Sequence, residues 1–255
     1  MIAMEDVSEL ERRGRILRAR IIETSHKAGI PHLGSCLSCV DILTALYFAV
    51  LRIDPAQPRD PGRDRFILSK GHGAAALFQV LAMRGYYPES RLDTYGEDGG
   101  VFAEHPPAPD YLPGIEAATG SLGHGLPIGL GMALAARVQQ QSYNVYAVLS
   151  DGECNEGSVW EAAMLAAAQG VSNLCVIIDF NKWQATGRSR EIMRLDPLAD
   201  KWRAFGWHAV EVDGHDLNGL LDTARAFPAA GRPTASASHS FRKSLLPEMG
   251  CRRPC

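Results

Sequence analysis

The segment Asn144–Gly187 decides the fold of this chain, and it reads NVYAVLSDGECNEGSVWEAAMLAAAQGVSNLCVIIDFNKWQATG. The apolar run Val145–Leu149 ends just before Asp151, a helical pattern follows, and a second apolar run, Leu174–Ile178, ends just before Asn181. A strand, a helix and a second strand in this order form a βαβ unit, whose parallel strands bring their carboxyl ends to one edge of a sheet. We therefore expect an α/β fold in which Asp151 and Asn181 face the same crevice.

The residues after the two strands are suited to a metal ion and a diphosphate. Mg²⁺ prefers oxygen ligands, of which one or two usually come from side chains and the rest from phosphates and water. Gly152 allows close approach of an anion to the backbone, and the start of the following helix offers free N–H groups. An Asp-Gly pair alone is more often a simple turn. The separation of 30 positions between Asp151 and Asn181 favours the metal site.

This segment resembles the thiamine diphosphate fingerprint, which usually begins Gly-Asp-Gly and closes with an Asn after the second strand. Ser150 stands here in place of the first Gly. More narrowly, the chain from about Glu5 to Thr234 resembles the N-terminal, diphosphate-binding domain of transketolases, with several motifs in that family's order. The resemblance implies Mg²⁺ and thiamine diphosphate as cofactors. It implies that Asp151 and Asn181 bind the metal through their side chains and Trp183 through its backbone carbonyl.

Strands and helices alternate along the rest of the chain, which predicts a parallel sheet with helices on both faces. The expected helices are Val7–Lys27, Ser38–Leu51, Ala74–Arg84, Gly123–Gln140, Asp196–Phe205 and Leu217–Phe227, and the further expected strands are Asp64–Ser69 and Trp207–Val212. The segment between Tyr86 and Pro113 is irregular and rich in Pro and Gly. A loop of this length usually contributes to a site or an interface.

The C-terminal residues depart from this pattern. A final aliphatic strand is expected after Thr234, but residues 235–255 read ASASHSFRKSLLPEMGCRRPC, with almost no β-branched residue. We therefore divide the chain into a diphosphate-binding domain, residues 1–234, and an atypical tail, residues 235–255. The abrupt loss of pattern indicates a shifted reading frame or an aberrant terminus.

Composition excludes several classes of protein. The 255 residues, 46% of them hydrophobic, suit one large α/β domain, and the net charge of −3 argues against nucleic acid or an anionic membrane as partner. No apolar stretch reaches the length of a membrane span, so we expect a cytoplasmic location. Cys36 and Cys39 form a Cys-x-x-Cys pair at the start of an apolar helix, and without a second such pair they are expected to be buried thiols.

Four histidines lie beside glycines or in loops: His32, His72, His105 and His124. The segments around the first three match loops of the transketolase family, whereas His124 stands where the family usually has Gln. Their ordinary pKa of about 6.5 suits proton transfer at neutral pH. By resemblance, His32 and His105 contact substrate oxygens and assist catalysis, and His72 lies nearer the diphosphate.

A glycine-rich loop completes the expected cofactor site. Ala118–Gly123 resembles the loop that contacts the aminopyrimidine of the cofactor through backbone groups. In it we expect Gly120 and Ser121 to allow that approach and Leu122 to pack on the ring, although a plain helix-start turn also fits the sequence. With Asp151, Gly152 and Asn181, these residues and His72 form the expected cofactor site. Glu153 is added as a weaker contact.

The chain ends near the close of the first transketolase domain. In that family, a glutamate from a second, pyrimidine-binding domain activates the cofactor. The chain therefore resembles the small subunit of a two-chain transketolase, with a C-terminal subunit as its partner in a dimer of heterodimers. The implied activity is transfer of a two-carbon ketol unit between sugars or sugar phosphates.

Other readings remain open. 1-Deoxyxylulose-5-phosphate synthase has a similar His-Leu-Gly-Ser loop, and dehydrogenases of the pyruvate type use the same cofactor. A non-catalytic interaction subunit, or a remnant that keeps the fold without turnover, is a reading of a different class. A nicotinamide-binding protein is disfavoured because no G-x-G-x-x-G follows an early strand.

Overall fold

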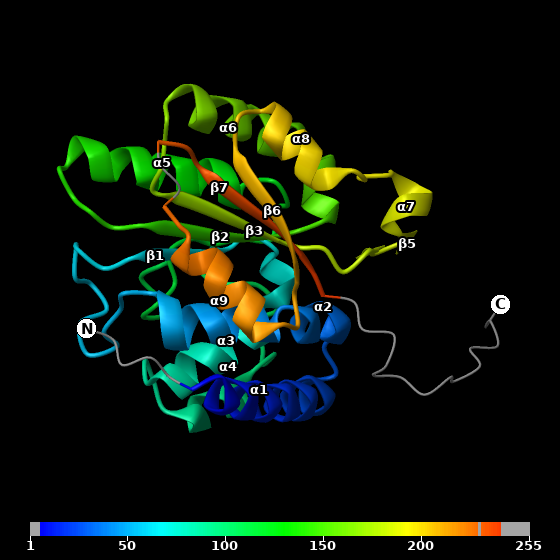
Figure 1. Cartoon of the computed structure of the whole chain (residues 1–255). Helices are drawn as coiled ribbons and strands as arrows, with labels where there is room; N and C mark the ends of the chain where they lie inside the picture. The colour runs from blue at the N-terminus through cyan, green and yellow to red at the C-terminus, as the bar shows by residue number, and fades with distance from the viewer. Residues whose placement is uncertain (1–5, 229–230, 241–255) are drawn as a thin grey trace.

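The structure is a computed structural model that describes residues 6–228 and 231–240. Its centre is a parallel sheet of five strands in the order β1-β2-β3-β7-β6, as Figure 1 shows. The strands are β1 (Arg65–Leu68), β2 (Val145–Ser150), β3 (Leu174–Asp179), β6 (His208–Asp213) and β7 (Thr234–His239). The expected α/β fold is confirmed. All carboxyl ends lie at the same edge of the sheet, because every pairing is parallel.

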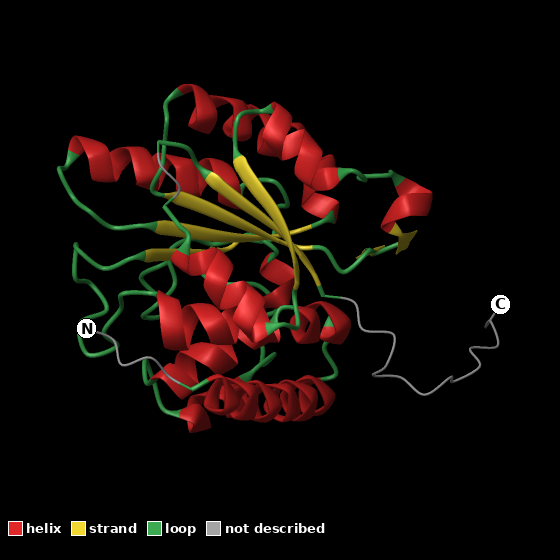
Figure 2. Ribbon diagram, in the orientation of Figure 1, coloured by secondary structure: helices red, strands yellow, loops and turns green. Residues whose placement is uncertain are grey.

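Helices cover both faces of the sheet (Figure 2). One face carries α1 (Val7–Ala28), α2 (Leu33–Ser38), α3 (Val40–Ala45), α4 (Ala74–Arg84) and α9 (Leu217–Arg225). The other face carries α5 (Gly125–Val138), α6 (Gly157–Ala168) and α8 (Leu198–Ala204). In the described part of the chain, no helix combines the length and the apolar character needed to cross a membrane.

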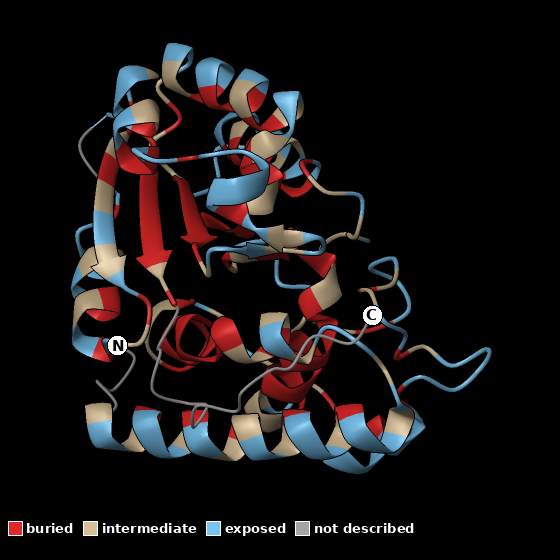
Figure 3. Ribbon diagram, turned by 90° about the vertical axis from the view of Figure 1, so that its right-hand side faces the viewer, coloured by how far each residue is buried: buried red, intermediate tan, exposed pale blue. Residues whose placement is uncertain are grey.

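Side chains of the central strands alternate between two apolar cores. On β2, Tyr146 and Val148 join the core under α1, α3 and α4, whereas Ala147 and Leu149 join the core under α5, α6 and α8. Successive side chains of a strand point to opposite faces, so a strand that is covered on both faces must be apolar throughout. This explains why β2 and β3 are fully buried in Figure 3 while the helices keep exposed outer faces.

Most of the expected helices are present with small shifts at their ends. The expected helix Ser38–Leu51 is divided instead into α2, α3 and a π-helical turn, η1 (Leu46–Val50). The first helix begins at an Asp6 cap, whose carboxylate accepts from the Ser8 amide, and ends at Gly29 with a φ of 65°. Both ends follow ordinary capping rules, which is why they could be predicted from the sequence.

The final strand was expected to be missing, and this expectation is wrong. Residues 234–239, TASASH, form β7, which pairs with β3 on one side and with β6 on the other. Its small side chains fit a position that is covered on both faces, and its two neighbours complete its backbone hydrogen bonds. β-propensity reflects such surroundings more than an intrinsic preference, so the lack of β-branched residues misled the prediction. A domain boundary at 234/235 would run through this strand, and residues 241–255 of the tail lie outside the described residues.

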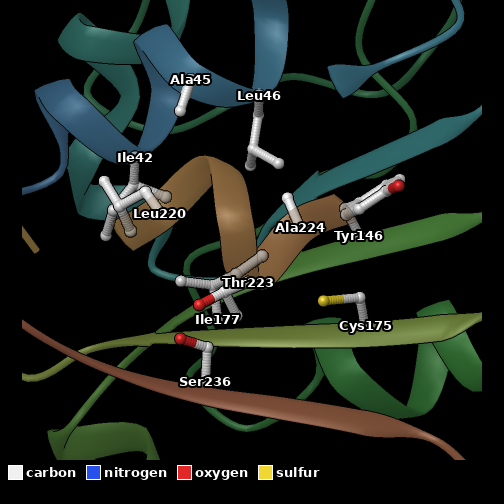
Figure 4. Close-up of a pocket in the computed structure, with 10 residues that line it drawn as sticks. All are labelled: Ile42, Ala45, Leu46, Tyr146, Cys175, Ile177, Leu220, Thr223, Ala224 and Ser236. Carbon is white, nitrogen blue, oxygen red and sulfur yellow. The ribbon is translucent and has the colours of Figure 1, made fainter. Parts of the chain in front are cut away.

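The small side chains of β7 leave a cavity of about 20 Å³ beneath α9 (Figure 4). Its wall includes Ser236 of β7, Cys175 and Ile177 of β3, and Leu220 of α9. The Ser236 hydroxyl has one weak side-chain contact, with the Ser238 hydroxyl at 3.4 Å. The cavity therefore has space for an added methyl group at Ser236.

We predict that Ser236→Val stabilises the protein, since it fills this cavity and adds a β-branched residue to a strand. The free energy of unfolding should rise by about 1 kcal/mol, and the melting temperature by about 2–4 °C. Ser236→Ala is the matched control, because it removes the hydroxyl without filling the space. If calorimetric melting places the valine variant at or below the alanine variant, the cavity explanation is wrong.

Candidate active site

A buried ion pair lies beneath the carboxyl edge of the sheet. Lys70 follows β1, and its Nζ lies 2.5 Å from Oδ2 of Asp179, the last residue of β3, with both side chains fully buried. Burial lowers the pKa of Lys70, but the Asp179 charge outweighs it and the pKa is raised. Because the sheet order is β1-β2-β3, the pair bridges the end of the middle strand.

Asp151 follows that middle strand and is the least satisfied acid of the site. Its Oδ2 accepts from the Ser189 hydroxyl at 2.6 Å, whereas its Oδ1 is buried with no hydrogen-bond partner in the described structure. Burial, reinforced by the nearby Asp179 charge, raises the pKa of Asp151 to about 6. A buried carboxylate oxygen without a donor is costly, and a bound cation is one way to relieve that cost.

The other two expected metal ligands lie in the turn that follows β3. The Oδ1 of Asn181 accepts from the backbone N–H of Trp183 at 2.9 Å. Trp183 then begins a short hairpin, β4 (Trp183–Gln184) with β5 (Gly187–Arg188), after which Ser189 reaches Asp151. The hairpin therefore ties the Asn181 turn to the Asp151 loop. The metal roles of Asn181 and of the Trp183 carbonyl stay predictions.

The residues of the site fit a cation and a diphosphate on three observations. Asp151 leaves a buried oxygen without a partner, and so does the buried amide nitrogen of Gln184 within the described residues. Gly152 packs against Gln184, with only 3.4 Å between its virtual Cβ and the Gln184 Cγ. Carboxylate and amide oxygens are the donors that Mg²⁺ prefers. No cluster of three His, Cys, Asp or Glu side chains suited to a metal occurs in the part of the chain that is described.

Glu153 holds three loops together. Its carboxylate is fully buried and accepts from the Ser69 hydroxyl, from the Gly123 amide at 3.0 Å and from the Ser150 amide at 2.9 Å. Burial raises its pKa against these hydrogen bonds. These three partners all lie within the protein, and a direct contact of Glu153 with a cofactor stays a prediction.

Two glycine-rich loops meet above this acid. A Cβ on Gly71 would lie 2.6 Å from the backbone of Thr119 and Gly120, so the two loops can touch only because Gly71 has no side chain. Gly120 has a φ of 141°, and its virtual Cβ lies 2.7 Å from the His105 ring. The next residues of the expected cofactor loop are solvent-accessible, with Ser121 exposed and Leu122 half-buried.

Three of the four predicted histidines are brought together. The His32 ring lies 5.4 Å from the His72 ring, and His105 is close enough to influence His72 electrostatically. Burial lowers the pKa of His72 to about 4, helped by the positive charges of Lys70, His32 and His105. His124 is exposed instead, with its Nδ1 beside the carbonyl oxygens of Ser121 and Leu122.

The Cys-x-x-Cys pair lies beneath the site as expected. Cys36 and Cys39 are buried, and their thiols donate to backbone carbonyl oxygens, that of His72 and that of Ser35 among them. Burial raises the pKa of both thiols, which keeps them in the unreactive protonated form. Their role is packing.

Sequence reasoning missed the residues that support the site: Lys70, Asp179, Ser189, Ser38 and Ser240. A signal was present for the first two. Lys70 and Asp179 are opposite charges at the ends of predicted parallel strands, so they were bound to meet at one edge. The serines gave no signal, because their contacts span up to 141 positions of sequence.

We predict that Lys70→Met destabilises the protein by about 3–5 kcal/mol, because Asp179 is left buried without its partner. The double variant Lys70→Met with Asp179→Leu should cost less than the sum of the single changes. Lys27→Met is the control, since Lys27 forms an exposed pair with Asp93 and should change stability by less than about 1 kcal/mol. Urea unfolding tests this. A loss below about 1 kcal/mol for Lys70→Met would contradict it.

We predict that His72 stays neutral between pH 5 and 8, so that its NMR signals do not titrate in this range. The unfolded chain protonates His72 near pH 6.5, whereas the folded chain does so near pH 4. Stability should therefore fall from pH 6.5 to pH 4, by at most about 3 kcal/mol from this residue. His72→Gln should flatten that fall, and the exposed His26→Gln should leave it unchanged. An unaltered fall in His72→Gln would refute the assignment.

Comparisons with known proteins agree with this site. The family described as transketolase, thiamine diphosphate binding domain, matches residues 10–237. One of the two subunits of an apulose-4-phosphate transketolase, from Phocaeicola vulgatus, is 40% identical over 237 residues, which cover 92% of this chain and 84% of that protein. The 6-deoxy-6-sulfo-D-fructose transketolase subunit SqwG of a Clostridium species is 40% identical over 231 residues, with coverage of 90% and 84%.

Longer relatives contain this chain as one part. Human transketolase is 37% identical over 228 residues, which are 89% of this chain but 36% of that protein. The solved transketolase of Leishmania mexicana superposes with a TM-score of 0.84 and 26% identity over 93% of this chain and 37% of that one. The chain thus spans about a third of the solved transketolases. It belongs to the transketolase family, as its thiamine diphosphate-binding domain.

Proposed function

We propose that this chain is the diphosphate-binding subunit of a two-chain transketolase that transfers a two-carbon ketol unit between sugars, with Mg²⁺ and thiamine diphosphate. The observation that carries the proposal is the unpartnered, buried Oδ1 of Asp151 at the end of β2. It lies in a family member whose Asn181 turn is tied back to the same loop through the β4–β5 hairpin and Ser189.

Each expected ligand has a place in this proposal. Asp151 and Asn181 would hold Mg²⁺ through side-chain oxygens, and Trp183 would hold it through its carbonyl. Gly152 would lie beside the diphosphate, while Gly120, Ser121 and Leu122 would lie along the organic part of the cofactor. When bound, the cofactor supplies the electron sink for cleavage of a carbon–carbon bond next to a carbonyl.

The histidines would handle protons at the substrate. His32 and His105, which are more accessible than the groups beneath them, would exchange protons with hydroxyl and carbonyl oxygens of the sugar. His72 is neutral at physiological pH, so one of its nitrogens donates and the other accepts. It can therefore orient a neighbouring group without adding a positive charge to the site.

A partner subunit belongs to the proposal. The relatives that this chain matches nearly end to end are named as subunits, whereas single-chain transketolases are far longer. A second polypeptide with the pyrimidine-binding and C-terminal domains would complete the cofactor site, and the assembly would be a dimer of heterodimers. We expect a cytoplasmic protein without nucleic-acid or membrane partners, in line with its net charge of −3.

The substrate would be an anionic sugar. Two relatives are named for apulose-4-phosphate and for 6-deoxy-6-sulfo-D-fructose, both of which carry a charged group. That these relatives are transketolases favours ketol transfer over the decarboxylation carried out by 1-deoxyxylulose-5-phosphate synthase.

Calorimetric titration of thiamine diphosphate with Mg²⁺ tests the proposal, into the chain alone and into the chain co-expressed with a partner that carries the other two domains. Binding should require Mg²⁺ and tighten with the partner. Asp151→Asn keeps the side-chain shape, so the protein should stay folded, but affinity should fall at least about tenfold, or 1.4 kcal/mol. Asp222→Asn, an exposed residue of α9, should bind like the wild type.

Two results would contradict the proposal. Binding that is unaffected by Asp151→Asn would exclude this site. No binding by the folded chain in either sample would favour the non-catalytic remnant or interaction subunit.

A further inference from the structure

His215, in the turn between β6 and α9, makes two hydrogen bonds that a neutral ring could not make together. Its Nδ1 lies 2.7 Å from Oδ2 of Asp41 on α3, and its Nε2 is bonded to the backbone oxygen of Ser240 just after β7. A carboxylate and a carbonyl are both acceptors, whereas a neutral imidazole has a single N–H. Both bonds therefore form only when the ring carries two protons and a positive charge.

The charges around this ring favour the cation. Asp41 faces it from α3 and also accepts both nitrogens of the Arg18 guanidinium of α1, at 3.0 and 2.6 Å. On its own turn, Asp213 accepts the His215 backbone N–H at 2.8 Å, and Asp216 caps α9. Glu211 of β6 and His239 of β7 pair with each other at 3.5 Å. The acids nearest the ring thus outnumber Arg18.

The pKa shifts of the pair agree with this count. The hydrogen bond to Asp41 raises the pKa of His215 against the effects of burial and of Arg18. Burial raises the pKa of Asp41, but hydrogen bonds from His215 and Arg18 hold it below its usual value.

A chain of contacts leads from His215 to the candidate active site. The Ser240 hydroxyl donates to Oδ1 of Asp179, and the Ser38 hydroxyl donates to Oδ2 of the same carboxylate at 2.6 Å. Lys70 completes this group and donates also to the Ser35 carbonyl at 2.8 Å. Lys70 and Asp179 each lie two positions before a predicted site residue, His72 and Asn181, so their placement sets the backbone of the site.

We propose that His215 is a positioning residue, a doubly donating cation that fixes the end of β7 at Ser240 and thereby holds Asp179 and Lys70 in place. The proposal rests on the proposed function only for the identity of the site above the pair. His215 has a raised pKa in the folded chain. Its stabilising effect is therefore complete below about pH 6.5, the unfolded value, and is lost as the pH rises through the folded value.

NMR of protein labelled with ¹⁵N at histidine tests the protonation state. Both ring nitrogens of His215 should carry protons at pH 7, and the assignment follows from His215→Gln. A neutral His215 ring at pH 7 would overturn the proposal. This measurement needs no cofactor, so it is independent of the proposed function.

Hydrogen exchange tests the positioning role, also without cofactor. The amides of Phe180 and Gly214 donate to the carbonyls of Ser238 and His239 near the end of β7, at 2.8 and 2.9 Å. In His215→Gln, the protection factors of both amides should fall about tenfold. The control His208→Gln, at the opposite end of β6, should leave them unchanged. In the wild type they should fall as the pH rises above 6.5. Equal protection in both variants would overturn the proposal.

Cofactor affinity tests the link to the site. Calorimetry at pH 6 should give thiamine diphosphate and Mg²⁺ about tenfold weaker binding in His215→Gln and in Ser240→Ala than in the wild type. Ser240→Ala keeps the backbone carbonyl, so His215 should remain charged in it. Wild-type affinity in both variants would overturn the link. If the wild type itself does not bind, the proposed function fails, while NMR and hydrogen exchange still decide the role of His215.

Discussion

The arrangement of the site depends on the ion pair between Lys70 and Asp179. The two residues belong to the outer strands of the trio β1-β2-β3, so their contact passes beneath the end of the middle strand. Asp151 stands at that end and feels the negative charge of Asp179 more than the positive charge of Lys70. A buried pair of this kind adds little net stability, but loss of one partner is costly. The pair therefore restricts the geometry of the strand ends more than it stabilises the fold.

The polar groups of this edge fall into two sets with different physical states. Glu153 and Asp179 are buried acids whose oxygens all have protein partners. Asp151 is a buried acid with one oxygen left over. Folding has placed this oxygen in a position that is unfavourable for the isolated chain and favourable for a bound cation. Such a local cost is a common mark of binding sites.

The residue types of β7 show the limits of local propensity. A strand of Ala and Ser would not be stable at the edge of a sheet, yet here both neighbours bond to it and helices cover both its faces. The small cavity under Ser236 is the consequence of these small residues. The same strand leads into Ser240, where a single hydroxyl connects the tail side of the sheet to Asp179.

The sequence by itself determined the fold class, the positions of most strands and helices, and three of the histidines that gather at the site. It could do so because apolar periodicity, capping residues and glycine at tight approaches are local signals, and because parallel strands must end at one edge. It also placed Asp151 and Asn181 at neighbouring strand ends.

Only the tertiary structure decided which polar groups meet beneath that edge. The Lys70–Asp179 pair, the Ser189 contact with Asp151 and the His215 cation join segments that are far apart along the chain. The strand β7 was likewise recognisable only from its neighbours. In each case the physical reason is the same. Burial and long-range hydrogen bonding set the energies of these groups, and neither is encoded in the residues next to them.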